Sequence, residues 1–327
     1  MLIAFLLFCV GVILLLVAGD ILVRGAAALA HKWGVPSLIV GLTIVAFGTS
    51  APELIVSVQS VLTGASELAI GNVIGSNIAN ILLVLGLPAI IMALPTNVAG
   101  VGRNSAVVVL ATVILVVLMF IHRPLVMWQG IILFTGIVLY LGWMFTLARS
   151  GAKDPALSEM ADMASMEGMP KSYVTMIAFT LLGIFGLAIG GGMIVKNATF
   201  IAEGFGVSEA LIGLTIVAIG TSLPELATVI VASWRGHNEV AIGNILGSNI
   251  FNIFAVMGAA AIAGPVSIPA KFMVFDVWVM LAATVALTIF ILRRAPIGRK
   301  TGIVLLLAYL LYMAAIARDI VGAGAGV

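Results

Sequence analysis

Charged residues are scarce in this sequence, and their scarcity argues against a soluble protein. Asp, Glu, Lys and Arg together make up 9% of its 327 residues, whereas apolar types make up 63% and the mean hydropathy is +1.29. A soluble domain carries roughly 25% charged residues, so this chain has too little polarity to cover a surface that faces water. The net charge of +2 gives no reason to expect a nucleic-acid partner.

Cysteine and histidine are also rare. Cys9 is the only cysteine, so no disulfide can form within the chain. The three histidines, His31, His122 and His237, lie near predicted helix ends, where we expect solvated interfacial roles rather than metal ligation. No nucleophile–base set, cofactor loop or nucleotide motif is present. The sequence therefore predicts neither an enzyme nor a resident cofactor.

Long runs without charge are abundant, namely 1–19, 33–52, 68–102, 124–148, 172–195 and 240–270. About 20 apolar residues cross a bilayer as a helix, because backbone groups in lipid must pair within their own segment. We interpret the first run as a retained helix rather than a signal peptide. Charges and turn residues predict an all-α polytopic membrane protein with ten transmembrane helices, near 2–29, 36–63, 67–92, 104–121, 125–149, 172–200, 207–234, 239–263, 273–292 and 299–318.

One polar stretch, 150–171, interrupts the apolar chain near its middle. It predicts a linker between a first unit (1–149) and a second unit (172–327). If the amino terminus lies outside, four basic residues fall on the outer side (Arg123, Lys196, Lys271 and Arg318) and the other eleven on the inner side (Arg24, Lys32, Arg103, Arg149, Lys153, Lys171, Arg235, Arg293, Arg294, Arg299 and Lys300). Because Lys and Arg concentrate in cytoplasmic loops, we expect both termini outside and a cytoplasmic linker.

The two units repeat each other when Gly41 is aligned with Gly213, which we call the repeat alignment. GLTIVAFGTSAPEL at 41–54 then matches GLTIVAIGTSLPEL at 213–226, and GNVIGSNIANI at 71–81 matches GNILGSNIFNI at 243–253. Such self-similarity indicates an internal duplication. Five helices per unit is an odd number, so the second unit must enter the membrane the opposite way up. Inverted repeats of this kind are typical of transporters, whose binding sites lie near the bilayer midplane.

Two acidic residues, Glu53 and Glu225, occupy equivalent places deep inside apolar segments. A carboxylate at bilayer depth is costly and marks a functional site by default, and these segments contain no Lys or Arg to neutralise it. Each Glu follows a Gly-Thr-Ser-x-Pro sequence. Because Pro52 and Pro224 cannot donate a backbone hydrogen bond, we expect both helices to break there and to free carbonyl groups, which transporters use as cation ligands.

The second repeated block adds further oxygen ligands. Its polar side chains are Ser76, Asn77 and Asn80 in the first unit and Ser248, Asn249 and Asn252 in the second. Residues four apart share a helix face. Together with carboxylates and carbonyls they form a hard, all-oxygen set, which suits calcium or sodium. Two carboxylates hold a charge of −2, which one divalent cation or two or more monovalent cations would balance.

Other features are weaker. Asp20 lies late in the first span and has no acidic counterpart at position 192, so it is a candidate pathway residue. Gly190, Gly191 and Gly192 predict close packing or sliding of the sixth helix.

At the two repeated blocks the chain resembles the calcium/cation antiporter superfamily, specifically the prokaryotic sodium/calcium exchangers. The motifs are G-T-S-A-P-E at 48–53 with G-S-N-I-A-N at 75–80, and G-T-S-L-P-E at 220–225 with G-S-N-I-F-N at 247–252. The resemblance spans essentially the whole chain. It implies ten helices in inverted five-helix halves, alternating access by sliding of helices one and six, the prokaryotic inner membrane as location and a monomer as functional unit.

The resemblance also implies roles for single residues. Calcium would bind the carboxylates of Glu53 and Glu225 and the carbonyls of Thr49 and Thr221. Sodium would use the same carboxylates with the Ala46 and Ala218 carbonyls and the hydroxyls of Ser50, Ser76, Ser222 and Ser248, while Asn80 and Asn252 line the central position. Some relatives carry Asp at position 252. Potassium-coupled members resemble that Asp form, so Asn252 favours a potassium-independent exchanger.

Several alternatives stay open on the sequence alone. The nearest is a proton/calcium antiporter of the same fold, in which the two Glu take up protons, although four Ser provide oxygen ligands that protons do not need. A magnesium or manganese exchanger is a second. Magnesium loses its water reluctantly and prefers tight octahedra, so a dry cage suits calcium better. A cation channel or a scaffold without transport is a third.

Overall fold

The computed structural model describes residues 1–35, 37–150, 170–205 and 218–324. These residues form helices joined by short connections. The predicted linker, apart from its ends, and the first part of the predicted helix 207–234 lie outside the described residues.

In the first half, nearly every predicted span appears as one long helix or as consecutive helical pieces. The elements are α1 (Leu2–Trp33), α2 (Ser37–Val40), η1 (Gly41–Val45), α3 (Ala46–Thr49), α4 (Ala51–Leu62), α5 (Ser66–Ala79), η2 (Asn80–Val84), α6 (Gly86–Ile91), α7 (Val101–Ile121) and α8 (Met127–Ser150). The elements η1 and η2 are single stretches of π-helix inside longer spans. These bounds confirm the predicted helices to within a few residues.

The second half follows the same order. Its elements are α10 (Tyr173–Gly204), α12 (Ala218–Thr221), α13 (Leu223–Trp234), α14 (Asn238–Phe251), η4 (Asn252–Val256), α15 (Met257–Ala263), η5 (Phe272–Asp276), α16 (Val277–Leu292) and α17 (Arg299–Gly324). The last helix runs past the predicted end at 318. Among the described residues, eight helices are long and apolar enough to cross a membrane, and the pair Leu38–Thr49 and Ala51–Leu62, bent by 44°, brings the number to nine if it counts as one broken span.

Burial separates central helices from peripheral ones. In the most apolar stretch of Asn238–Ala263, 89% of the residues are buried, and in that of Ser66–Ile91, 72%. The corresponding values for α1, α8, α10 and α17 are 22–28%. Because lipid tails solvate apolar side chains, the peripheral helices carry exposed Leu, Ile and Phe without cost. The polar blocks of α5 and α14 therefore lie at the centre of the protein.

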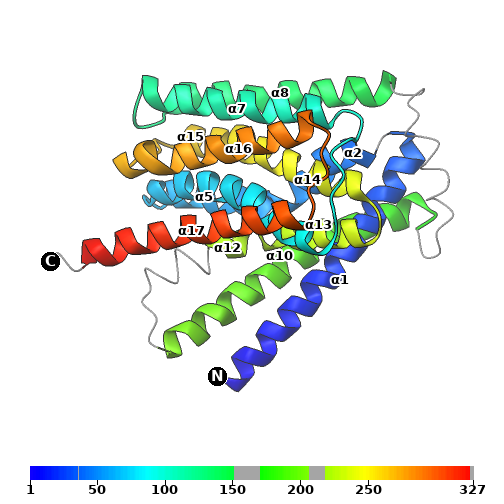
Figure 1. Ribbon diagram of the computed structural model, residues 1–327, viewed down its shortest axis with the longest axis horizontal. Helices are drawn as coiled ribbons and strands as arrows, with labels where there is room; N and C mark the ends of the chain where they lie inside the picture. Colours follow the sequence, from blue (N-terminus) through cyan, green and yellow to red (C-terminus); the bar gives the residue numbers. More distant parts are fainter. Residues whose placement is uncertain (36, 151–169, 206–217, 325–327) are drawn as a thin grey trace.

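The two longest helices, α1 and α10, pack side by side and run obliquely to the others (Figure 1). Glycines permit this close approach. A Cβ on Gly183 would come within 2.5 Å of the Leu22 Cβ, and one on Gly190 within 3.0 Å of the Gly11 carbonyl. A Cβ on Gly192 would meet nothing within 4 Å. The prediction of close packing is thus correct for Gly190 and wrong for Gly192.

Several contacts between the halves occur in pairs that the repeat alignment relates. Leu94 forms an antiparallel bridge with Ile297, and Val266 forms one with Leu125. A Cβ on Gly130 would meet the carbonyl of Gly258 at 2.8 Å, and one on Gly302 would meet that of Gly86 at 2.6 Å. Contacts within each half recur too: Tyr140 donates to Asn104 at 3.1 Å and Tyr312 donates to Asp276 at 2.8 Å.

The long helices α1 and α10 pack differently against the two halves of the protein. Gly19 of α1 lies against Ala227 and Val231 of α13, and Ala227 is 1% exposed. The equivalent residue of α4, Ile55, is 64% exposed, and α10 does not pack along α4 as α1 packs along α13 in the described part of the chain. One face of α13 is therefore covered, while the matching face of α4 is open.

The histidines follow the prediction in two cases of three. His31 and His122 are exposed. His237, between α13 and α14, is instead 4% exposed. Its burial, together with the positive charge of Arg235, lowers its pKa. The expected solvated role is thus wrong for His237.

Candidate ion-binding site

The repeated Gly-Thr-Ser-x-Pro sequence breaks both central helices at the same point. Ser50 separates α3 from α4 with φ −86° and ψ 2°, and Ser222 separates α12 from α13 with φ −88° and ψ 2°. Pro52 and Pro224 follow as second residues of the new helices, where a missing N–H costs little. The predicted breaks are confirmed, and each places a Glu in the first turn of a helix.

Glu53 and Glu225 are 1% and 0% exposed. The amino end of a helix carries partial positive charge, which favours a carboxylate in its first turn. Ser50 Oγ donates to Glu225 Oε1 at 3.2 Å and so joins the two halves. Neither oxygen of Glu53, nor Oε2 of Glu225, has a hydrogen-bond partner in the described residues. The two carboxyl groups also interact electrostatically.

The second block contributes from α5 and α14. Asn80 and Asn252, 1% and 0% exposed, begin the π-helical stretches η2 and η4. A π-helical stretch is common at functional sites. Here η2 packs against α13, which carries Glu225, and η4 packs against α4, which carries Glu53. Each Asn thereby begins a stretch that packs on the helix carrying the Glu of the other half.

Most of the buried polar atoms that lack a partner belong to this region. Within the described chain, seven of the buried oxygen atoms without a hydrogen bond belong to predicted ligands, namely Glu53 Oε1 and Oε2, Glu225 Oε2, Ser76 Oγ, Ser222 Oγ, Asn80 Oδ1 and Asn252 Oδ1, and the other two are Asn249 Oδ1 and Ser233 Oγ. A buried polar group without a partner costs about 1–3 kcal/mol, so native proteins rarely leave one, and still more rarely several together. Such a set fits a site whose oxygen atoms are satisfied by cations.

Other predicted residues lie in the same region but bond within the protein. Thr49, 0% exposed, donates through Oγ1 to Asn244 Oδ1 at 3.1 Å and lies 3.4 Å from Ser248 Oγ. Ala46 begins α3, and its carbonyl accepts from the amide of Ser50 at 2.9 Å. Ala218 and Thr221 begin and end α12. Asn77 and Asn249 each donate to the carbonyl four residues earlier at 2.7 Å.

Two asparagines that the sequence argument missed contact the backbone carbonyls of the two Glu residues. Asn72 Nδ2 donates to the Glu53 carbonyl at 3.2 Å and to Ser57 Oγ at 2.9 Å. Asn244 Nδ2 lies 3.5 Å from the Glu225 carbonyl, while its Oδ1 accepts from Thr49. The signal was present, because both stand at the same place of the second block, 19 residues after their Glu.

The described residues contain no group of three or more His, Cys, Asp or Glu that would hold a metal ion. The site therefore combines two carboxylates with neutral oxygen atoms from both halves. Hard cations such as Ca²⁺ accept such ligands, whereas soft metals require sulfur or nitrogen.

Comparison with known proteins identifies the family. The model of the family described as "Sodium/calcium exchanger protein" matches residues 3–147 and 175–317. This chain belongs to that family. The sodium/calcium exchanger MaX1 of Methanosarcina acetivorans is 30% identical over 94% of this chain and 97% of its own length. The inner membrane protein YrbG of Escherichia coli is 36% identical over 96% of this chain and 97% of its own.

The fold agrees with that of a solved exchanger. The structure of the sodium-calcium exchanger NCX_Mj aligns with a TM-score of 0.81 and 28% identity, covering 96% of this chain and 99% of that one. The chain is therefore a multi-pass membrane protein of a prokaryotic exchanger family, as its apolar runs and repeated motifs predict.

Proposed function

We propose that this protein exchanges sodium for calcium across the membrane through one site built around Glu53 and Glu225. The observation that carries the proposal is the set of buried oxygen atoms without partners, drawn from both halves and centred on two carboxyl groups. Membership of the sodium/calcium exchanger family supports sodium and calcium as the two exchanged ions.

The proposed ligands are those that the family resemblance implies. Calcium binds the two carboxylates and the carbonyls of Thr49 and Thr221. Sodium ions use the same carboxylates with the carbonyls of Ala46 and Ala218 and the hydroxyls of Ser50, Ser76, Ser222 and Ser248. A hydroxyl can turn its lone pairs to a cation even where it now donates a hydrogen bond. Asn80 and Asn252 line the centre.

The charge of the two carboxylates explains why the transport of sodium is coupled to that of calcium. One Ca²⁺, or two or more Na⁺, neutralises the two carboxylates, whereas the site without ions keeps a charge of −2. Burying that charge without a counter-ion is costly in the membrane. The loaded states therefore close and reorient, and the unloaded one does not, which makes transport an exchange rather than a leak.

Alternating access rests on the duplication. We infer ten helices in two inverted five-helix halves, and the paired contacts of Leu94 with Ile297 and of Val266 with Leu125 support this relation. Sliding of α1 and α10 then uncovers the face of α13 and covers that of α4. The covered Ala227 and the open Ile55 fit one of these two states. The Lys and Arg distribution favours both termini outside, and we infer a cytoplasmic linker and a monomer as functional unit.

A proton/calcium antiporter is the second candidate. Glu53 favours it, because a buried carboxyl group without any hydrogen-bond partner in the described residues is a natural acceptor of a proton when no cation is bound. The serine hydroxyls around it favour sodium.

Calcium binding to the purified protein tests the site. We expect saturable binding of radioactive calcium that sodium, but not choline, displaces. Glu53→Gln and Glu225→Gln should each abolish it, because the amide keeps the shape and removes the charge. Asp276→Asn is the matched control: its bond to Tyr312 should survive, as the natural Asn104 makes the same bond to Tyr140. Wild-type affinity in either Gln variant would contradict the proposed site.

A further inference from the structure

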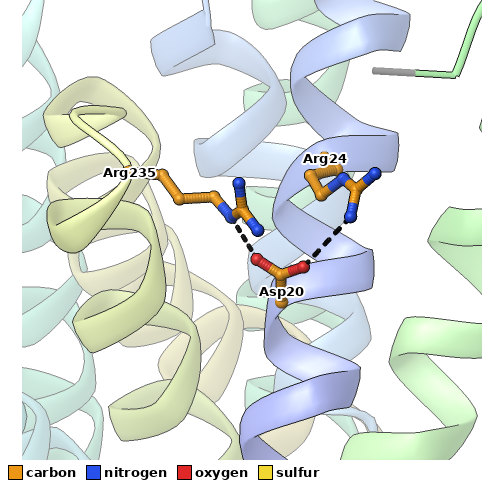
Figure 2. A network of polar contacts seen from close by, with 3 residues as sticks. All are labelled: Asp20, Arg24 and Arg235. Carbon is orange, nitrogen blue, oxygen red and sulfur yellow. Dashed lines mark hydrogen bonds and ion pairs between the residues drawn. The ribbon is translucent and has the colours of Figure 1, made fainter. Parts of the chain in front are cut away.

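A charged cluster outside the ion site joins α1 to the end of α13. Asp20 lies between two arginines, as Figure 2 shows. Arg24 Nη1 contacts its Oδ2 at 3.3 Å, and Nε of Arg235 contacts its Oδ1. Arg235 is the residue directly after α13. The contact between Asp20 and Arg235 therefore connects two helices that lie far apart in the sequence.

The cluster lies beside the packing that covers α13. Gly19, next to Asp20, is the point where α1 rests on Ala227 and Val231. Arg24 contacts α10 rather than α13: its guanidinium lies 5.5 Å from the ring centre of Phe179 in α10. Asp20 and Arg24 thus remain with the pair α1–α10, whereas Arg235 remains with α13.

The repeat supplies no counterpart for this ion pair. The repeat alignment maps Asp20 onto Gly192 and Arg235 onto Thr63, and Arg24 onto Lys196. In a state where α10 covers α4, the equivalent positions would place Gly192 beside Thr63, two residues that cannot form an ion pair. An ion pair is therefore available when α1 covers α13 and has no equivalent when the arrangement is reversed.

We propose that Asp20 and Arg235 form a latch that favours the state in which α1 covers α13. The proposal rests on the alternating access inferred above. Breaking the latch leaves Asp20 paired with Arg24, so opening does not strand an uncompensated carboxylate. In the predicted orientation the latch closes the cytoplasmic side of the site, and its loss shifts the population towards the inward-open state.

The size of the bias follows from exposure. The Asp20 and Arg235 side chains are 24% and 41% exposed. A partly exposed ion pair shifts an equilibrium by roughly two- to fivefold, and salt screens it. The latch therefore tunes the equilibrium without locking it, as an exchanger that visits both states requires.

Thiol accessibility under α1 tests the latch. Val231→Cys in a Cys9→Ala background places one reporter in the covered face, and nanodiscs expose both membrane faces to a charged methanethiosulfonate reagent. We expect Asp20→Asn and Arg235→Gln each to raise the labelling rate by roughly two- to fivefold, and the double variant to add nothing further. High choline chloride should raise the rate with both charges present and should leave the double variant unchanged.

The control is Lys196→Gln, which removes a charge at the position of α10 that matches Arg24. It should leave labelling unchanged. Equal labelling in all variants, or additive effects of Asp20→Asn and Arg235→Gln, would overturn the latch. Sodium-dependent calcium uptake by the Val231→Cys, Cys9→Ala protein is measured alongside. If calcium uptake depends on sodium but Asp20→Asn and Arg235→Gln leave the labelling rate unchanged, the latch alone is rejected. If these substitutions raise the labelling rate but there is no sodium-dependent calcium uptake, the proposed exchange is rejected and the latch is kept.

Discussion

At the level of single residues, Glu53 and Glu225 lie in matching sequence motifs, but their carboxyl groups have different hydrogen-bond partners. The Ser50 hydroxyl donates to Glu225, whereas the hydroxyl of its counterpart Ser222 has no partner and the Glu53 carboxyl group accepts no hydrogen bond in the described residues. The difference arises because Ser50 crosses between the halves. The two carboxyl groups are therefore unequal in this structure: both oxygens of Glu53, but only Oε2 of Glu225, lack a hydrogen-bond partner in the described residues.

Asn244 allows a prediction about positioning. Its amide oxygen accepts from Thr49, and its nitrogen lies at the Glu225 carbonyl. Asn244→Ala removes the shortest hydrogen bond of the buried Thr49 hydroxyl, which keeps the Ala46 carbonyl at 3.3 Å and Ser248 Oγ at 3.4 Å, and the loss of one such bond costs about 0.5–1.5 kcal/mol. If that bond positions the Thr49 carbonyl for calcium, we expect calcium affinity to fall by roughly 2- to 13-fold, measured by direct calcium binding.

The control for Asn244→Ala is Thr112→Val. Thr112 is also 0% exposed, but its hydroxyl bonds to the Val108 carbonyl in α7. Its affinity for calcium should stay at the wild-type value. An equal loss in both variants would mean that Asn244 supports the fold in general and does not position the site.

The sequence predicts the charged residues of this site better than the neutral ones that support them. A Glu in an apolar segment is conspicuous because its burial is costly. Asn72 and Asn244 stand in a helix with glycines and serines, a pattern equally typical of helix packing. Their partners lie on another helix, so their role depends on a contact that local sequence does not contain.

At the level of helices, the broken spans are predictable and the π-helical stretches are not. Gly, Ser and Pro at 48–52 remove a donor and loosen the turn, so the 44° bend follows from residue chemistry. The stretch Asn80–Val84 reads N-I-L-L-V, which suits an ordinary helix. The stretch packs against α13, a tertiary contact that the local sequence does not contain.

The close contact between α1 and α10 gives a prediction about stability. A Cβ at Gly183 would meet Leu22 backbone atoms at 2.6 and 2.7 Å. Gly183→Ala should therefore force the helices apart, at a cost of about 1–3 kcal/mol. Its Tm in detergent should fall below that of the wild type.

Gly192→Ala, on the same helix, is the comparison for Gly183→Ala. Its Cβ has free space, and Ala favours helix over Gly, so Tm should stay equal or rise. A Tm for Gly183→Ala that equals that of Gly192→Ala would show that α1 and α10 are less tightly packed than described.

At the level of the whole molecule, the sequence predicts the duplication and leaves the state open. The repeat alignment follows from the printed sequence, and contacts such as Leu94–Ile297 and Val266–Leu125 respect it. Which long helix covers which half is different, because the two states of the proposed alternating access would share one sequence and differ by a small free energy. The exposed Ile55 and buried Ala227 therefore had to come from the structure.

The orientation in the membrane and the tenth helix stay predictions. The first rests on where Lys and Arg fall. The second concerns 207–234, of which the described part begins at Ala218.

Calcium uptake into proteoliposomes tests the central claim of one site shared by two ions. We predict uptake of radioactive calcium into sodium-loaded vesicles under an outward sodium gradient, less uptake with sodium equal on both sides, and none with choline inside. Glu53→Gln and Glu225→Gln should abolish it, and Asp276→Asn should not. Uptake that ignores sodium and follows a proton gradient, or that survives either Gln substitution, would contradict the account.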